Sequence, residues 1–402
     1  MASVRMAVER LHENGTLPTS GIVSIRDLQQ RFQPIPEGST RILLQKMFGS
    51  VSTSHPWAVI LCRFKGSPPE PTLEGPIEQF YRDIFTPGTG GLVEYWRDAS
   101  LGAIDIMNSS VLGWVELEIT RANAGLGSGV TRSTLVDDAI RAAQRNGLDP
   151  VTGFFSQIAI ITQKWSRDDV PGGTGGAPDW TNPNDPRIPF WIDGSEDGRG
   201  KVTLTPPHDG DISAHEMGHS FGMQHDVASD LKTHYADPCC IMSQNAAFIH
   251  PRWMVNFGPA ICLPHLIQRN WMYARRIYYD DGRWLAQPDG ITLPLASIFD
   301  PGAHANLGIK LSYKDPAQSW DYYVEYVKPT DWNQGLQIPY VFIRRISSVI
   351  GIGETPIYLG AIKVPTTLGV QTDFVEPLGD VKFQVEQLDA EGRIMKVSAK
   401  KL

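Results

Sequence analysis

The stretch HEMGHSFGMQHD, residues 215–226, holds three of the ten histidines of this 402-residue chain. If its first part is helical, His215 and His219 lie four residues apart and project from one face, one turn above the other. Two imidazoles at this spacing can bind one metal ion, and zinc prefers such nitrogen ligands in tetrahedral geometry. The stretch therefore predicts a zinc site.

Gly222 allows a third ligand to reach this site, and Glu216 supplies a base. Glycine adopts the left-handed conformation that ends a helix and turns the chain, so the chain can return His225 to the same ion. Glu216 follows the first ligand but does not share its line along the helix. Its carboxylate can therefore reach a water at the open position of the ion without binding the metal. We expect His215, His219 and His225 as zinc ligands and Glu216 as general base.

Composition limits the other function classes. The chain is 41% hydrophobic and 20% charged, as in an ordinary globular protein, and its length allows two or three domains. A net charge of −8 argues against a nucleic-acid partner. No apolar run reaches the length of a membrane span. The amino-terminal residues carry no secretory signal as written, so localisation stays open and secretion by another route is possible. The oligomeric state stays open as well.

Apolar patterning predicts an α+β domain over residues 51–280. Residues 1–50 show helical spacing and form either an amino-terminal extension or a pro-segment. The predicted strands cover 57–64, 111–120, 156–163 and 201–207, and the predicted helices 78–85, 91–100 and 133–147. A Gly/Pro/Asp-rich loop is expected over 166–200. Strand 201–207 ends in prolines directly before the histidines, which indicates an edge strand.

A separate β-sandwich is predicted for residues 285–402, and it should supply no zinc ligand. Short β-like runs separated by turn residues recur there at regular spacing. They cover 292–299, 309–314, 321–327, 340–346, 357–362, 381–388 and 394–400.

The four cysteines do not form a disulfide scaffold. Cys62 lies inside the apolar run 57–64, which indicates core packing. Cys262 could pair with Cys239 or Cys240 in an oxidising compartment, or all could be buried free thiols. Both alternatives stay open.

The elongated pattern H-E-x-x-H-x-x-G-x-x-H resembles the signature of the metzincin zinc peptidases. The wider sequence is most similar to the gametolysin and immune-inhibitor-A-like peptidases, through the runs at 57–64 and 95–117, the YADPCCIM segment and NWM at 270–272. The resemblance implies a twisted mixed sheet with helices, split by a cleft whose floor carries the zinc helix. It also implies a zinc-dependent endopeptidase acting on a protein or peptide substrate.

The resemblance assigns roles to further residues. Met242 would lie in a tight turn beneath the metal, although a methionine there can also be a plain core residue. Asp226 would hold the lower loop of the site, or else be an exposed loop carboxylate. Some metzincins have a metal-binding tyrosine two residues after the methionine, where this chain has Gln244. We therefore expect three protein ligands and no tyrosine switch. Tyr235 and two further histidines, His208 and His234, are weaker candidates for the cleft.

Two other functions are compatible with these residues. The chain could be an inactive zinc-binding relative that acts as an adhesion or binding module. Alternatively, it could hydrolyse small non-peptide substrates. Glu216 argues against the first alternative, because a structural zinc site does not require that carboxylate. A closed pocket instead of a long groove would favour the second.

Overall fold

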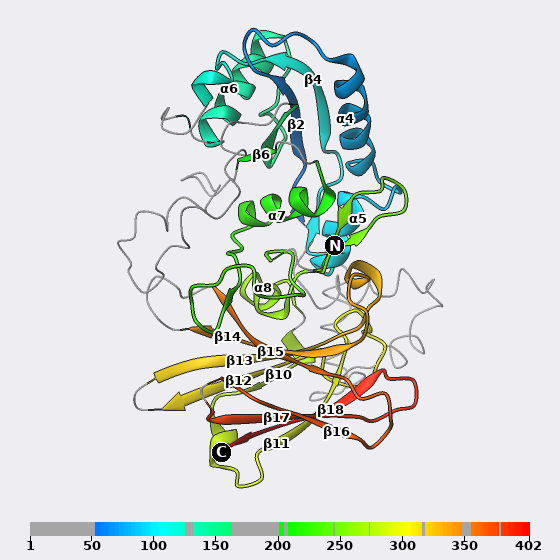
Figure 1. Ribbon diagram of the computed structural model, residues 1–402, viewed down its shortest axis with the longest axis vertical. Coiled ribbons are helices and arrows are strands. Elements are labelled where there is room, and N and C mark those ends of the chain that lie inside the picture. Colours follow the sequence, from blue (N-terminus) through cyan, green and yellow to red (C-terminus); the bar gives the residue numbers. More distant parts are fainter. Residues whose placement is uncertain are drawn as a thin grey trace, which may run out of the picture.

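In Figure 1 the chain forms a helix-covered sheet above and a β-sandwich below, with the histidine-bearing helix α7 (Gly210–Ser220) between them. This computed structural model describes residues 53–124, 130, 132–162, 201–204, 208–243, 246–272, 274–315, 318–347, 355–377 and 379–402. The predictions for residues 1–50, for the whole of the 166–200 loop and for Gln244 lie outside these ranges. The fold is α+β, as predicted.

The upper sheet has the strand order β4-β2-β5-β6. Its strands are β4 (Ser110–Glu116), β2 (Trp57–Arg63), β5 (Ser156–Ile161) and β6 (Val202–Leu204). All three pairings are parallel, whereas we expected a mixed sheet. The first six residues of β2 are buried, because a strand lies on each side and helices cover both faces. β6 ends the described sheet, which confirms its predicted edge position.

Helices cover the two faces of this sheet differently. On one face, Ile60 and Cys62 of β2 pack against the alanine-rich side of α6 (Arg132–Arg145), so Cys62 is a core residue as predicted. On the other face, Val59 and Leu61 share a core with α4 (Pro71–Ile84), α5 (Leu92–Ala99) and α7. The period-two alternation of β2 thus separates two cores. The second of them includes the helix that carries the histidines.

Helix α4 begins seven residues before its predicted start at residue 78. Pro71 at the first helical position suits a helix start, since its missing N–H would be unpaired there anyway. Pro76 lies inside the helix, where proline is normally disruptive. Burial of Ile77, Tyr81 and Ile84 on one face stabilises the helix despite this proline.

The lower part is a β-sandwich, as predicted. One sheet has the order β10-β12-β13-β14-β15-β7 and the other β11-β18-β17-β16. The strands of the first are β10 (Ile277–Asp280), β12 (Gly308–Asp315), β13 (Gln318–Val327), β14 (Tyr340–Ser347), β15 (Pro356–Lys363) and β7 (Val227–Ala228). Those of the second are β11 (Ile291–Ala296), β16 (Gln371–Val375), β17 (Val381–Gln387) and β18 (Ile394–Lys401). Side chains of both sheets, such as Tyr322 and Phe383, share one core.

The two parts are joined by a strand and by a common core. β7 begins two residues after His225 and pairs in parallel with β15 of the sandwich. Trp332 and Tyr323 of the carboxyl-terminal half belong to the same core as Met242 and Trp96. Small elements complete this region: the pairs β1 (Thr53–Ser54) with β3 (Ile104–Asp105) and β8 (Phe248–Ile249) with β9 (Asn256–Phe257), and helix α8 (Leu263–Gln268). The division into domains near residues 280–285 stays a prediction.

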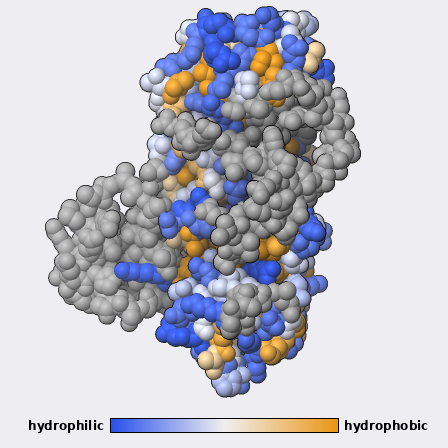
Figure 2. All heavy atoms as spheres, turned by 90° about the vertical axis from the view of Figure 1, so that its left-hand side faces the viewer, coloured by the Kyte–Doolittle hydropathy of each residue, from blue (hydrophilic) through white to orange (hydrophobic). Residues whose placement is uncertain are grey.

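No helix within the described ranges is long and apolar enough to cross a membrane. On the face that Figure 2 shows, the coloured surface is mostly hydrophilic, with hydrophobic residues in small separate groups.

Candidate metal centre

Helix α7 ends in the turn that the sequence predicted at Gly222. The amide of Gly222 donates to the carbonyl of His219 at 2.8 Å, and that of Met223 to Gly218 at 3.1 Å. This pair of bonds is the Schellman arrangement, whose glycine is left-handed, and Gly222 has φ +81°. The chain therefore reverses within a few residues and brings His225 back to the helix.

The three histidines converge as predicted. The Nε2 atom of His225 lies 3.0 Å from Nε2 of His215 and 3.0 Å from Nε2 of His219. The three side chains are buried, at 4%, 6% and 6% exposure. They form one of the groups among the described residues whose ligand atoms lie within 4.8 Å of one another and could hold a metal ion.

Backbone carbonyls fix the orientation of two of these imidazoles. Nδ1 of His215 lies 2.9 Å from the carbonyl oxygen of Ile241, and Nδ1 of His219 lies 2.9 Å from that of Met223. Since a carbonyl only accepts, Nδ1 donates in both rings, and Nε2 can present a lone pair to a metal ion. Both lone pairs point toward Nε2 of His225, and a single proton there cannot satisfy both. A cation between the three nitrogens can.

Glu216 is half-buried on the same helix and is not a member of this nitrogen group. Its neighbour on the helix, His215, has its ring among the converging nitrogens. That Glu216 stays outside the ligand set remains a prediction. Its role as a base is taken up below.

Met242 lies in a tight turn, as the resemblance implied. The amide of Ser243 donates to the carbonyl of Cys240 at 2.9 Å, which closes a turn with Ile241 and Met242 at its centre. Met242 is fully buried, and a Cβ added to Gly218 would lie 2.7 Å from its sulfur. The absence of a side chain at Gly218 thus allows Met242 to pack directly under the helix, between the turns that carry His215 and His219.

Tyr235, which the resemblance offered only as a weaker candidate for the cleft, lies next to the histidines. Its hydroxyl lies 3.3 Å from Nε2 of His225. Its backbone has φ +58°, a conformation that bulky residues rarely adopt and that surrounding structure must hold. Nothing in the residue pattern indicated this, because it follows from the path of the loop between β7 and the Met242 turn.

Asp226 is fully buried, so the exposed-loop alternative for this residue is wrong. One carboxylate oxygen accepts from the hydroxyl of Ser243 at 3.3 Å, and the other lies 3.4 Å from Nε2 of His265. Asp226 directly follows the third histidine, so its contact with Ser243 links this part of the chain to the Met242 turn. This agrees with the role that the resemblance implied.

The two further histidines differ in their surroundings. The ring of His234 lies 6.1 Å from the ring of His225, at the edge of the metal centre. Nδ1 of His208 instead lies 2.9 Å from the hydroxyl of Tyr81 in α4. Burial lowers the pKa of His208 to about 4, so its imidazole is neutral at physiological pH.

All four cysteines are free and buried, which is the second of the two alternatives left open by the sequence. Cys240 and Cys262 nevertheless lie close together, in a group with Asp226 and His265.

A buried arginine of the sandwich supports the loop below the histidines. Arg344 of β14 pairs with Asp237 through two of its nitrogens and donates to the carbonyl of Cys239 at 3.1 Å. It also donates to Glu325 at 2.7 Å. Burial raises the pKa of Glu325 to about 7, although the neighbouring Arg344 opposes this shift. Sequence reasoning missed Arg344, because a lone arginine in a β-like run usually faces solvent.

Comparison with known proteins adds little to this geometry. No protein-family model matches the chain, and no curated protein matches it significantly. One similar solved structure is the catalytically inactive OgpA from Akkermansia muciniphila in complex with an O-glycopeptide substrate. The alignment covers 88% of this chain and 94% of that one, at 11% identity and a TM-score of 0.29. A TM-score this low supports no conclusion about this chain.

Proposed function

We propose that this chain is a zinc-dependent endopeptidase of the metzincin type. The proposal rests on the convergence of three Nε2 atoms at buried positions, two of them with their lone pairs fixed by backbone carbonyls. Nitrogen ligands at about 2.0–2.1 Å from a tetrahedral zinc lie about 3.3–3.4 Å apart. The observed separations of 3.0 Å are close to this, so the three histidines fit the ion.

The residues divide the chemistry among them. His215, His219 and His225 would hold the zinc, which when bound acts as a Lewis acid and makes a water acidic enough to ionise near neutral pH. The Glu216 carboxylate takes a proton from the attacking water and then passes it to the amine of the departing peptide. The Tyr235 hydroxyl lies 3.3 Å from Nε2 of His225, and we propose that it donates to the oxygen of the scissile carbonyl.

The substrate would lie along β6. This strand is at the edge of the described sheet and belongs, through Val202 and Leu204, to the same core as α7. An extended peptide can add to such an edge by main-chain hydrogen bonds. An endopeptidase needs this kind of open edge, whereas a hydrolase of small molecules needs an enclosed pocket.

Glu216→Gln tests the proposal most directly. The variant should fold and keep its zinc, because the three ligands remain. It should lose about 10²–10⁴-fold in the rate of hydrolysis of unfolded protein or peptide mixtures, as expected for a general base. Zinc content, melting temperature and peptide release should be measured on the same samples.

Two controls separate the alternatives. Glu118→Gln changes an exposed carboxylate paired with Lys65 and should leave hydrolysis unchanged. His219→Ala should lose both zinc and hydrolysis.

A zinc-loaded wild type that cleaves no peptide would favour the inactive binding module. Cleavage of small esters or amides without cleavage of peptides would favour the non-peptide hydrolase.

A further inference from the structure

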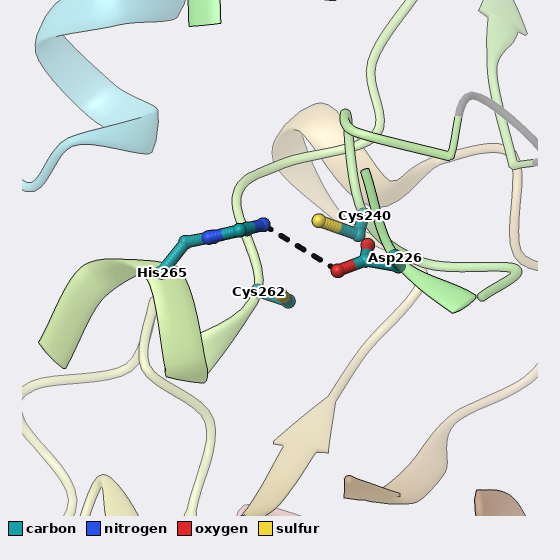
Figure 3. Close-up of side chains that lie close together, drawn as sticks. All are labelled: Asp226, Cys240, Cys262 and His265. Carbon is teal, nitrogen blue, oxygen red and sulfur yellow. Dashed lines mark ion pairs between the residues drawn. The ribbon is translucent and has the colours of Figure 1, made fainter. Parts of the chain in front are cut away.

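Four buried side chains from three segments lie close together, as Figure 3 shows. They are Asp226 beside the third histidine, Cys240 at the start of the turn, Cys262 at the cap of α8, and His265 inside α8. Each of the four residues is 0% exposed. Their ligand atoms, two sulfurs, one imidazole nitrogen and one carboxylate oxygen, all lie within 4.8 Å of one another.

Polar atoms of this group lack hydrogen bonds within the described part of the chain. Both ring nitrogens of His265 and the Oδ1 atom of Asp226 have no hydrogen-bond partner. The nearest approach between them, 3.4 Å, is longer than a normal charge-assisted hydrogen bond of about 2.7–2.9 Å. Leaving such buried groups without a partner is unfavourable, because they have lost their hydrogen bonds to water. In Figure 3 the His265 ring and the Asp226 carboxylate point toward one another, with Cys240 and Cys262 beside them.

We propose that Asp226, Cys240, Cys262 and His265 form a second, structural zinc site. Four ligands of these types satisfy a closed tetrahedral zinc, in which neighbouring ligand atoms lie about 3.3–3.8 Å apart. The observed upper limit of 4.8 Å requires only a small contraction around the ion. Two thiolates disfavour calcium and magnesium, which prefer oxygen ligands.

The local structure places Cys262 and His265 for joint binding. Cys262 caps α8, and His265 is the third residue of the helix, so both face the same side of its first turn. Such a C-x-x-H spacing brings a sulfur and a nitrogen to one ion.

A divalent cation would balance most of the charge of this group. Zinc binding replaces the two thiol protons, which pass to solvent. Two thiolates and one carboxylate then face the two positive charges of the ion. The buried guanidinium of Arg344 is close enough to act electrostatically on Cys262 and partly offsets the remaining negative charge.

The second zinc would hold the elements of the first site together. Asp226 follows His225, and Cys240 precedes Ile241, whose carbonyl orients His215. An ion between them and α8 would fix the third histidine and the Met242 turn relative to one another. Its four ligands leave no open position, so its role is structural.

Metal stoichiometry and cobalt spectroscopy test this site separately from the proposed peptidase activity. The full-length chain should bind two equivalents of zinc. After cobalt substitution, it should show thiolate-to-metal charge transfer in the near ultraviolet, which a three-histidine site cannot produce. His219→Ala should lose one equivalent and keep the thiolate band. Cys262→Ser should lose the band, whereas Cys239→Ser, at a buried neighbour of Cys240 outside the group, should keep it.

Two results would overturn the proposal. One is the absence of the thiolate band from both wild type and His219→Ala, neither of which alters the four residues. The other is a titration under denaturing, non-reducing conditions that finds two free thiols instead of four, which would show a Cys240–Cys262 disulfide. Because wild type and His219→Ala decide the first result, the test holds even if Cys262→Ser fails to fold. Loss of peptidase activity alone would not bear on this site.

Discussion

The three-histidine group and the Arg344 network are both buried beside the loop of residues 226–243, but they are built in opposite ways. The histidines lie within eleven consecutive residues, on one helix and the turn that follows it. Arg344 reaches Asp237 across 107 residues of sequence and Glu325 across 19. The first group depends on local backbone geometry. The second depends on the sandwich being folded.

Their electrostatics differ as well. The rings of His215 and His219 are oriented by neutral carbonyls and offer lone pairs to a cation. Arg344 instead supplies the cation itself and neutralises carboxylates that would otherwise be buried without a partner. The comparison teaches that a short motif can specify metal ligands, while the position of the loop below them depends on distant residues.

The largest effect is expected from Arg344→Met. This change leaves Asp237 and Glu325 buried without their cation, which should cost about 3–5 kcal/mol in the free energy of unfolding. Urea unfolding measures this directly, and zinc affinity should fall with it. Arg345→Met, on the other face of β14 over the ring of Trp320, should cost under about 1.5 kcal/mol. Equal losses in the two variants would contradict the support role of Arg344.

The carboxylates paired with Arg344 can be compared with the buried carboxylate of Asp211 on α7, which should make the free energy of unfolding depend on pH. Burial raises its pKa from 3.8 to about 6, so the folded state holds the proton more tightly than the unfolded state. Stability is therefore lost as the pH rises from about 4 through about 6. Asp211→Asn should remove this loss and raise the free energy of unfolding above pH 6 by up to about 3 kcal/mol.

Asp230→Asn is the matched control for that measurement. Hydrogen bonds from Thr233 lower the pKa of the exposed Asp230, which gives the opposite sign. This variant should gain no stability above pH 6. A flat pH profile for wild type between pH 4 and 6 would show that Asp211 does not act as described.

Gly218→Ala tests the contact between α7 and the Met242 turn. A methyl group there would lie 2.7 Å from the Met242 sulfur and 3.0 Å from Met223 Cε, so we expect a loss of about 1–3 kcal/mol. Alanine otherwise favours a helix interior over glycine by about 1 kcal/mol. In a Met242→Ala background most of this loss should disappear, because only the longer contact with Met223 remains. A persistent loss would place the clash elsewhere.

The smallest effect is expected from Met242→Leu. The change nearly conserves volume and should cost under about 1.5 kcal/mol, with zinc retained. Because the shape beneath the histidines changes, turnover should fall modestly. Melting and hydrolysis measurements both indistinguishable from wild type would remove any special role for this methionine.

Sequence reasoning succeeded where one local pattern decided the structure. The apolar run at 57–64, the amphipathic helix at 133–147 and the regular β-like runs after residue 285 all appear as elements. It missed β16, whose exposed and half-buried residues alternate without a strong apolar signal. The two-residue strand β7 carries no readable pattern and exists because β15 lies beside it.

The sequence alone determined the convergence of the histidines, because helical spacing and one left-handed glycine fix their relative positions within a few residues. Only the tertiary structure decided what surrounds them. It brought Tyr235 to His225, Arg344 under the loop, and Asp226, Cys240, Cys262 and His265 into one group. These contacts join segments far apart along the chain. They depend on the packing of the sandwich against the upper part, which no local periodicity encodes.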